Sequence, residues 1–120
     1  MSIKALENFS LNVLGTLYSV FYKDEQTDKF LKECDGYTDK TTKQIVISTE
    51  PKDNQLGNWD EYRKKVLRHE IIHAFLFESG LHGQANYDAQ NGQEHPEMMV
   101  DWFAAQWHKL AEAFKNADAI

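Results

Sequence analysis

A long helical segment with a clear start and a clear stop, from about Trp59 to Ser79, most constrains what this chain can fold into. Asn58, followed three residues later by Glu61, resembles a capping box, in which side chains bind the first free backbone amides of a helix. Gly80 supplies a left-handed stop. Apolar residues occur on nearly every side of the segment, so we expect the helix to be buried.

Strand signals precede this helix in the chain. The β-branched and aromatic residues from Leu11 to Tyr22, which surround Gly15, predict a strand with a bend or bulge. Tyr37 to Asp39, a turn at Lys40 to Lys43, and Gln44 to Ser48 predict a hairpin. Its second arm is the clearest strand in the sequence.

Two further helices are predicted, one between the strands and one after the long helix. A short one is expected within Glu25 to Cys34, before the turn signal Asp35-Gly36. A last helix is expected from Pro96, in the first position that proline favours, to about Lys115. Its apolar stripe is predicted to contain Val100, Phe103, Trp107, Leu110 and Phe114.

Composition limits the classes of protein that fit. With 120 residues, 42% of them hydrophobic, and no internal repeat, residues 1–120 are expected to form one domain with a single core. The net charge of −6 argues against a nucleic-acid or anionic-membrane surface. Cys34 is the single cysteine, which excludes a disulfide within the chain, and neither a signal peptide nor a membrane span is evident. We therefore expect a cytoplasmic protein.

The long helix carries the pattern His69-Glu70-Ile71-Ile72-His73, the HExxH form. Residues four apart lie on one helical face, so both imidazoles can bind one metal ion, and zinc is the ion that such ligands favour. Zinc lowers the pKa of its water to about 7, and Glu70 could act as general base toward that water.

Chance is the alternative explanation of so short a pattern, since two His and a Glu would show this spacing in about 2% of such His-rich chains. Context favours a metal site. A carboxylate and two imidazoles in a buried helix need hydrogen bonds or a metal, because burying them unpaired would cost several kcal/mol, on the order of the penalty for isolated polar groups.

A catalytic zinc site needs a third protein ligand. The extended metzincin pattern is absent, because Leu76 and Ser79 stand where it requires Gly and His. Glu97 is the preferred candidate, and Asp101, on the same helical face, could orient a ligand histidine. The alternative is that both carboxylates belong to the solvated face of the last helix.

Other residues could also bind the metal or assist catalysis. Glu94, His82 and His95 are rival third ligands. A donor that stabilises the developing oxyanion is commonly His, Tyr or Arg, and the candidates between the two helices are Tyr87, His82 and His95. The sequence does not choose among them.

These motifs resemble the gluzincin-type zincin metallopeptidases, which pair HExxH with a later Glu-x-x-x-Asp. The chain looks like the small zincin domains of phage and prophage proteins that are related to ImmA/IrrE-like peptidases. The stretch from Glu97 to Ala104 is similar to the Glu-x-x-Ala-Asn-x-Phe-Ala segment of those proteins, with Val100 and Asp101 differing from it. Glu97 stands at the position of their metal-binding carboxylate.

The resemblance implies an α+β, zincin-like fold, with a small sheet and hairpin beside the active-site helix and a C-terminal helix that supplies the third ligand. It also implies that an edge strand pairs with an extended substrate peptide, a role that suits Gln44 to Ser48. ImmA-like relatives often act on repressors. No DNA-binding segment is evident here, so a repressor-type partner would be a separate chain.

The leading hypothesis is a zinc-dependent metallopeptidase: His69, His73 and Glu97 bind Zn²⁺, Glu70 activates water, and Asp101 orients a ligand histidine. One alternative is a non-catalytic module, in which the metal stabilises the domain and the surface binds a partner. Another is a zinc hydrolase that acts on a non-peptide bond.

Overall fold

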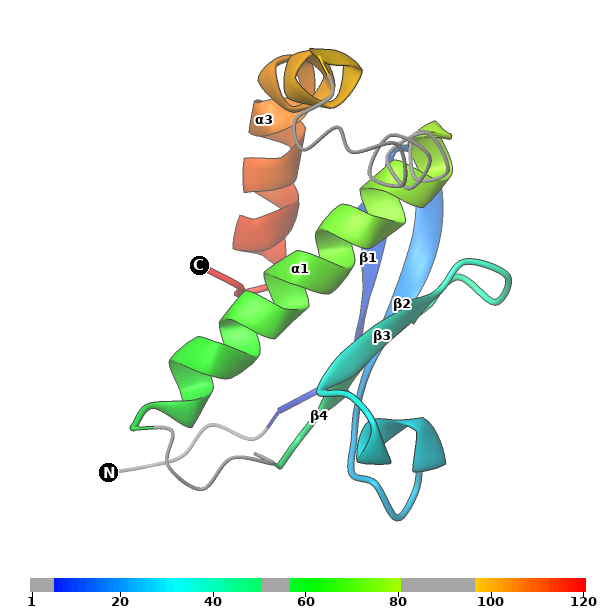
Figure 1. Ribbon diagram of the computed structural model, residues 1–120, viewed down its shortest axis with the longest axis vertical. Helices are drawn as coiled ribbons and strands as arrows, with labels where there is room; N and C mark the ends of the chain where they lie inside the picture. Colours follow the sequence, from blue (N-terminus) through cyan, green and yellow to red (C-terminus); the bar gives the residue numbers. More distant parts are fainter. Residues whose placement is uncertain (1–5, 51–56, 81–96) are drawn as a thin grey trace.

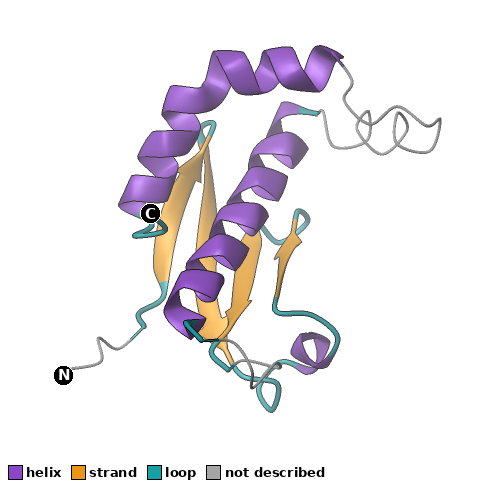
Figure 2. Ribbon diagram, turned by 60° about the vertical axis from the view of Figure 1, so that its left-hand side comes forward, coloured by secondary structure: helices purple, strands orange, loops and turns teal. Residues whose placement is uncertain are grey.

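The computed structural model describes residues 6–50, 57–80 and 97–120. It shows a mixed α+β architecture, in which a four-stranded sheet carries two long helices on one face (Figures 1 and 2). The strands are β1 (Phe9–Val13), β2 (Thr16–Lys23), β3 (Gly36–Asp39) and β4 (Gln44–Ser48). The helices are the 3-10 helix η1 (Lys29–Lys32), α1 (Trp59–Ser79) and α3 (Glu97–Asn116). The predicted α+β class is confirmed.

The first two strands form a tight hairpin where the sequence had predicted one bent strand. β1 pairs antiparallel with β2, and Val13 lies opposite Thr16. Leu14 and Gly15 both adopt positive φ, 50° and 94°, as a two-residue turn of type I′ requires. The side-chain oxygen of Asn12 accepts a hydrogen bond of 2.8 Å from the amide of Gly15. The prediction of a single strand was wrong because two left-handed residues reverse the chain there.

The predicted second hairpin is present, but its position in the sheet differs from the expectation. β3 and β4 pair antiparallel, with Asp39 opposite Gln44. The strand order is β1-β2-β4-β3, and β4 also pairs in parallel with β2. β4 is therefore an interior strand, so the expectation that Gln44–Ser48 forms the edge was wrong. The edge beside α1 is β3.

Helix α1 begins and ends where its sequence signals predicted. The side chain of Asn58 accepts a hydrogen bond of 3.2 Å from the amide of Glu61, and Gly80 is left-handed with a φ of 80°. The helix is buried on one side only, because the sheet covers that side. In place of the predicted helix within residues 25–34, the structure has the four-residue η1, which Asp28 caps.

The main core lies between the sheet and the two long helices. It contains inward-facing strand residues, residues from one face of each helix and two alanines that follow α3: Leu11, Val13, Tyr18, Val20, Ile45, Ile47, Leu67, Ile71, Ala74, Phe75, Leu110, Ala113, Ala117 and Ala119. The small side chains of Ala113 in α3 and Ala117 just after it face the core, whereas Trp107 in α3 is 66% exposed. The prediction of Trp107 in the buried stripe was therefore wrong.

The predicted start of α3 at Pro96 falls outside the described residues. The helix ends at Asn116, one residue after the predicted end. Among the described residues, no helix is long and apolar enough to cross a membrane.

Candidate metal centre

The two histidines of the HExxH pattern face each other on α1. Because they lie four residues apart, their side chains stack one turn above the other. Nε2 of His69 lies 3.1 Å from Nε2 of His73, and the ring centroids are 4.7 Å apart. Both nitrogens therefore face the same small volume beside the helix.

This geometry fits a shared metal ion. Two imidazole nitrogens at about 2.0–2.1 Å from a tetrahedral zinc are about 3.3–3.4 Å apart. The observed separation of 3.1 Å also suits a hydrogen bond between the rings. Either arrangement requires a neutral acceptor ring, and the pKa of His73 is lowered, first by burial and then by the charge of His69. His73 is thus suited to bind a cation through an unprotonated ring nitrogen.

Glu70 lies on the neighbouring face of α1, against the edge strand β3. It is only 7% exposed. The hydroxyl of Thr38 lies 2.9 Å from Oε1 of Glu70 and 3.0 Å from its backbone oxygen, so one proton serves two acceptors. Burial raises the pKa of Glu70, while the Thr38 hydrogen bond and the charge of His69 oppose that rise. The carboxyl is therefore held in place and is more basic than in water.

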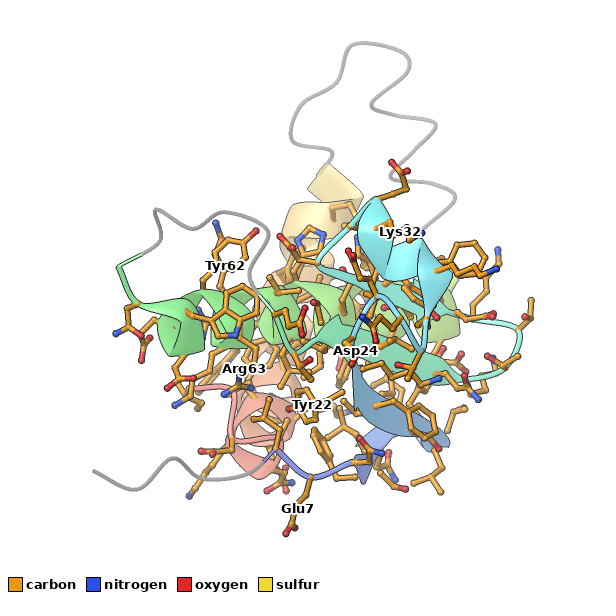
Figure 3. The ribbon with its side chains drawn as sticks, turned by 90° about the horizontal axis from the view of Figure 1, so that it is seen from below. Glu7, Tyr22, Asp24, Lys32, Tyr62 and Arg63 are labelled. Carbon is orange, nitrogen blue, oxygen red and sulfur yellow. The ribbon has the colours of Figure 1, made fainter. Side chains whose placement is uncertain are left out.

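A hollow of about 250 Å³ opens beside these residues. It is lined by Asp35, Gly36, Tyr62, Lys65, Val66, His69 and Glu70. The hydroxyl of Tyr62 donates a 2.6 Å hydrogen bond to Oδ2 of Asp35, which ties α1 to the segment before β3. Figure 3 shows Tyr62 and Arg63 leaving α1 on opposite sides, and Arg63 packs over the ring of Tyr22. The hollow therefore lies on the side of α1 away from that buried arginine.

A larger hollow, about 480 Å³, lies elsewhere, between the β1–β2 turn and α3. It contains none of the HExxH residues, and its walls include Leu14, Gly15, Lys109 and Glu112. Volume alone would favour it as the functional site. We favour the smaller hollow, because its walls include the buried carboxylate of Glu70 and the imidazole of His69, which faces that of His73.

The opposite end of the histidine pair is covered by an aromatic ring. His73 stacks on Phe77, with ring centroids 6.1 Å apart and an interplanar angle of 25°. Nζ of Lys40, from the β3–β4 turn, lies 5.3 Å from the centroid of Phe77. The hollow at Lys65, the histidine pair, and Phe77 with Lys40 therefore follow one another along α1, and we call this strip beside β3 the cleft.

Most of the remaining predicted site residues fall outside what the structure describes. These are the side chains of Glu97 and Asp101, and all of His82, Tyr87, Glu94 and His95. Among the described residues, no group of three His, Cys, Asp or Glu side chains gathers closely enough to hold a metal ion. The third ligand remains a prediction.

The described part of α3 contacts the C-terminal half of α1. The ring of Trp102 lies 6.4 Å from that of Phe75, two residues after His73. Both views of the ribbon show α3 beginning at the end of the molecule where α1 finishes (Figures 1 and 2). The backbone of α3 therefore starts near the C-terminal end of α1, whereas the histidine pair lies nearer the middle of α1.

The structure adds site residues that the sequence reading missed. Thr38, Gly36 and Lys65 all border the cleft, and none belongs to a recognisable motif. The available signal was strand alternation, which places Gly36 and Thr38 on the same face of β3. Alternation does not tell whether this face of β3 contacts α1. That contact depends on packing between segments 32 residues apart in the sequence.

Comparison with known proteins gives no relative. No protein-family model matches the chain, and no significant match occurs among the curated proteins or the solved structures.

Proposed function

We propose that this chain is a zinc-dependent metallopeptidase with its active site in the cleft between α1 and β3. The observation that carries the proposal is the 3.1 Å approach of two imidazole Nε2 atoms beside the buried, hydrogen-bonded carboxylate of Glu70. In this proposal His69, His73 and Glu97 hold Zn²⁺, and Asp101 orients a ligand histidine. A sheet packed beside the motif helix supports a zincin-like form of the α+β fold.

The protein's own groups suit general base catalysis. When bound, Zn²⁺ would supply Lewis acidity and lower the pKa of a water to about 7. Thr38 holds Oε1 of Glu70, so Oε2 would receive the proton from the attacking water. Burial raises the pKa of Glu70, which brings it nearer the range where a carboxylate can both accept a proton and return it to a leaving amine.

The edge strand β3 would bind the substrate backbone. It pairs with β4 on one side, and no other described strand pairs with it. An extended peptide can add to such an edge through main-chain hydrogen bonds. Gly36 and Thr38 would then place the peptide along the histidine pair. The substrate would be a peptide or protein, and the resemblance suggests a separate repressor-type protein as one candidate.

Metal analysis of the purified protein tests the site. We expect one zinc ion per chain in the wild type, loss of zinc in His69→Ala, and a large reduction in Glu97→Ala. His108→Ala, which changes an exposed histidine on α3, is the matched control and should retain zinc. A wild-type chain that binds no divalent metal would refute the site.

A second experiment separates a peptidase from a metal-stabilised binding module or a hydrolase of other bonds. Glu70→Gln should keep zinc and lose cleavage of a peptide mixture, as read by mass spectrometry. Cleavage that survives this change would remove Glu70 from its role. A zinc-loaded wild type that cleaves no peptide would favour one of the two alternatives.

A further inference from the structure

The hollow beside His69 has the size of a subsite for one side chain. Its volume of about 250 Å³ lies below the range of about 300–1,000 Å³ that is typical of pockets for whole small molecules. The backbone of Gly36 approaches α1 so closely that a Cβ there would lie 2.9 Å from Cγ1 of Val66. β3 and α1 are therefore in close contact at Gly36, on one side of the hollow.

The charges in this hollow are not equivalent. Oδ2 of Asp35 accepts the hydroxyl hydrogen of Tyr62, and Oε1 of Glu70 lies 2.9 Å from the hydroxyl of Thr38. Lys65 is exposed, and no described carboxylate oxygen lies within 4.0 Å of its ammonium group. This includes the carboxylate of Glu61, one helical turn earlier. Both carboxylates of the hollow are thus already engaged within the protein, whereas its cation is available to an incoming group.

The other end of the cleft shows the same pattern. Lys43 is neutralised there by an ion pair of 2.8 Å with Glu78. Lys40 instead places its Nζ over the ring of Phe77, which stacks on His73, and it forms no ion pair with a described carboxylate. Two lysines that form no ion pair with a described carboxylate therefore flank the histidine pair, although the whole chain carries a net charge of −6.

Spacing assigns the two lysines to opposite sides of the reacting bond. Lys65 precedes His69 by four residues, about 6 Å along the helix axis, which is close to the length of two residues of an extended peptide. Lys40 lies beyond His73 on the other side. An extended chain along β3 would thus pass one lysine, then the metal site, then the other.

We propose that the cleft selects an extended peptide with acidic side chains, and that Lys65 and Lys40 recognise them on opposite sides of the scissile bond. This inference rests on the proposed peptidase function for the position of that bond. A basic side chain would meet an unpaired ammonium at either end of the cleft. The acidic preference is local, because the net charge of the chain would by itself attract basic peptides.

Cleavage specificity tests the proposal directly. The zinc-loaded protein is incubated with a mixed peptide library, and the cleaved bonds are identified by mass spectrometry. We expect Asp and Glu to be enriched about threefold to fivefold within two residues of the bond, the range of one exposed ion pair. Lys65→Glu should replace this preference by Lys and Arg on one side only, and Lys40→Glu on the other. Lys109→Glu, in the larger hollow, is the control with the same charge change and should leave both preferences intact.

A binding measurement distinguishes failure of this inference from failure of the peptidase proposal. Fluorescein-labelled peptides that differ only in Glu, Gln or Lys content are titrated with the same proteins by fluorescence polarisation. Tighter binding of the Glu peptide, reversed by Lys65→Glu and Lys40→Glu, supports the acidic cleft even if no library peptide is cleaved. Cleavage without acidic enrichment, or equal binding of the three peptides, would overturn it.

Discussion

Thr38 on the edge strand and Glu70 on the long helix are joined by a hydrogen bond of 2.9 Å from hydroxyl to carboxylate. This bond crosses from the sheet to the helix at the centre of the proposed active site. Because the carboxyl is almost fully buried, an unpaired anionic oxygen there would be costly. Thr38 is therefore a positioning residue for the proposed general base.

Replacing Thr38 by valine keeps the shape of the side chain and removes the hydroxyl. The hydrogen bond lowers the pKa of Glu70, so its loss should raise that pKa further. We expect the acid limb of the pH profile of kcat/KM to move to higher pH, and activity near neutrality to fall on the order of tenfold.

Thr38→Ser restores a hydroxyl and should return the acid limb close to its original position. A purely structural role would instead predict that Thr38→Val lowers activity equally at all pH values. Such a uniform loss, with the limb unmoved, would contradict the assignment.

Local signals in the sequence were sufficient to predict α1 with its ends. The cap at Asn58 and the left-handed Gly80 depend only on neighbouring residues, so the helix bounds match. The first hairpin was missed because Leu14 is an unusual residue for a left-handed turn position. Asn12, whose side chain binds the amide of Gly15, was the local clue.

Long-range packing explains what the sequence could not predict. The sequence of a hairpin does not determine which of its two strands lies at the sheet edge. For this reason β3 was not identified as the strand beside the cleft. In α3, aromatic residues suggested a stripe through Trp107, whereas small residues such as Ala113 allow the helix to approach the core. The HExxH residues were found because their spacing within one helix fixes their geometry.

The close approach of β3 to α1 predicts that Gly36 does not tolerate a side chain. A Cβ at this position would lie 2.9 Å from Cγ1 of Val66 and 3.1 Å from Cδ1 of Ile47. Gly36→Ala should therefore force the strand and the helix apart and reduce the free energy of unfolding by about 1–3 kcal/mol. Urea unfolding measures this loss.

Shortening the facing side chain provides the control. If the clash is the cause, Val66→Ala should cost less stability in the Gly36→Ala background than in the wild type. Additive losses in this double-mutant cycle would show that Gly36 and Val66 do not oppose each other.

The side chains that pack the core and the two proposed metal-binding histidines lie on different sides of α1. Leu67, Ile71 and Phe75 are at most 2% exposed, whereas His69 is exposed. Removing metal with a chelator should therefore leave a folded protein. Its melting temperature should fall only by the amount that metal binding adds to the stability of the folded state. Circular dichroism melts of metal-free protein should remain cooperative. Loss of the far-ultraviolet helical signal on chelation would favour the metal-stabilised module.

A carboxylate at the end of α1 makes stability dependent on pH. Oε2 of Glu78 accepts hydrogen bonds of 2.8 Å from Lys43 and 2.7 Å from the buried Tyr18. Lys43 first, and then Tyr18, lower the pKa of Glu78 from 4.5 to about 2. A carboxyl with a lowered folded-state pKa stabilises the protein above its unfolded pKa. That stabilisation should be lost as the pH falls from 4.5 to about 2.

Glu78→Gln should therefore destabilise the protein near neutral pH and have little effect in strong acid. We expect a loss of about 1 kcal/mol near pH 7, modest because the Lys43 side chain is 41% exposed and solvent screens the pair. Urea unfolding of both proteins between about pH 7 and pH 2 measures the difference, which should shrink as Glu78 becomes protonated. Glu112→Gln, which changes an exposed carboxylate on α3, should show no such convergence. A difference between Glu78→Gln and wild type that stays constant with pH would mean that the amide disturbs packing and that the ion pair does not stabilise the fold.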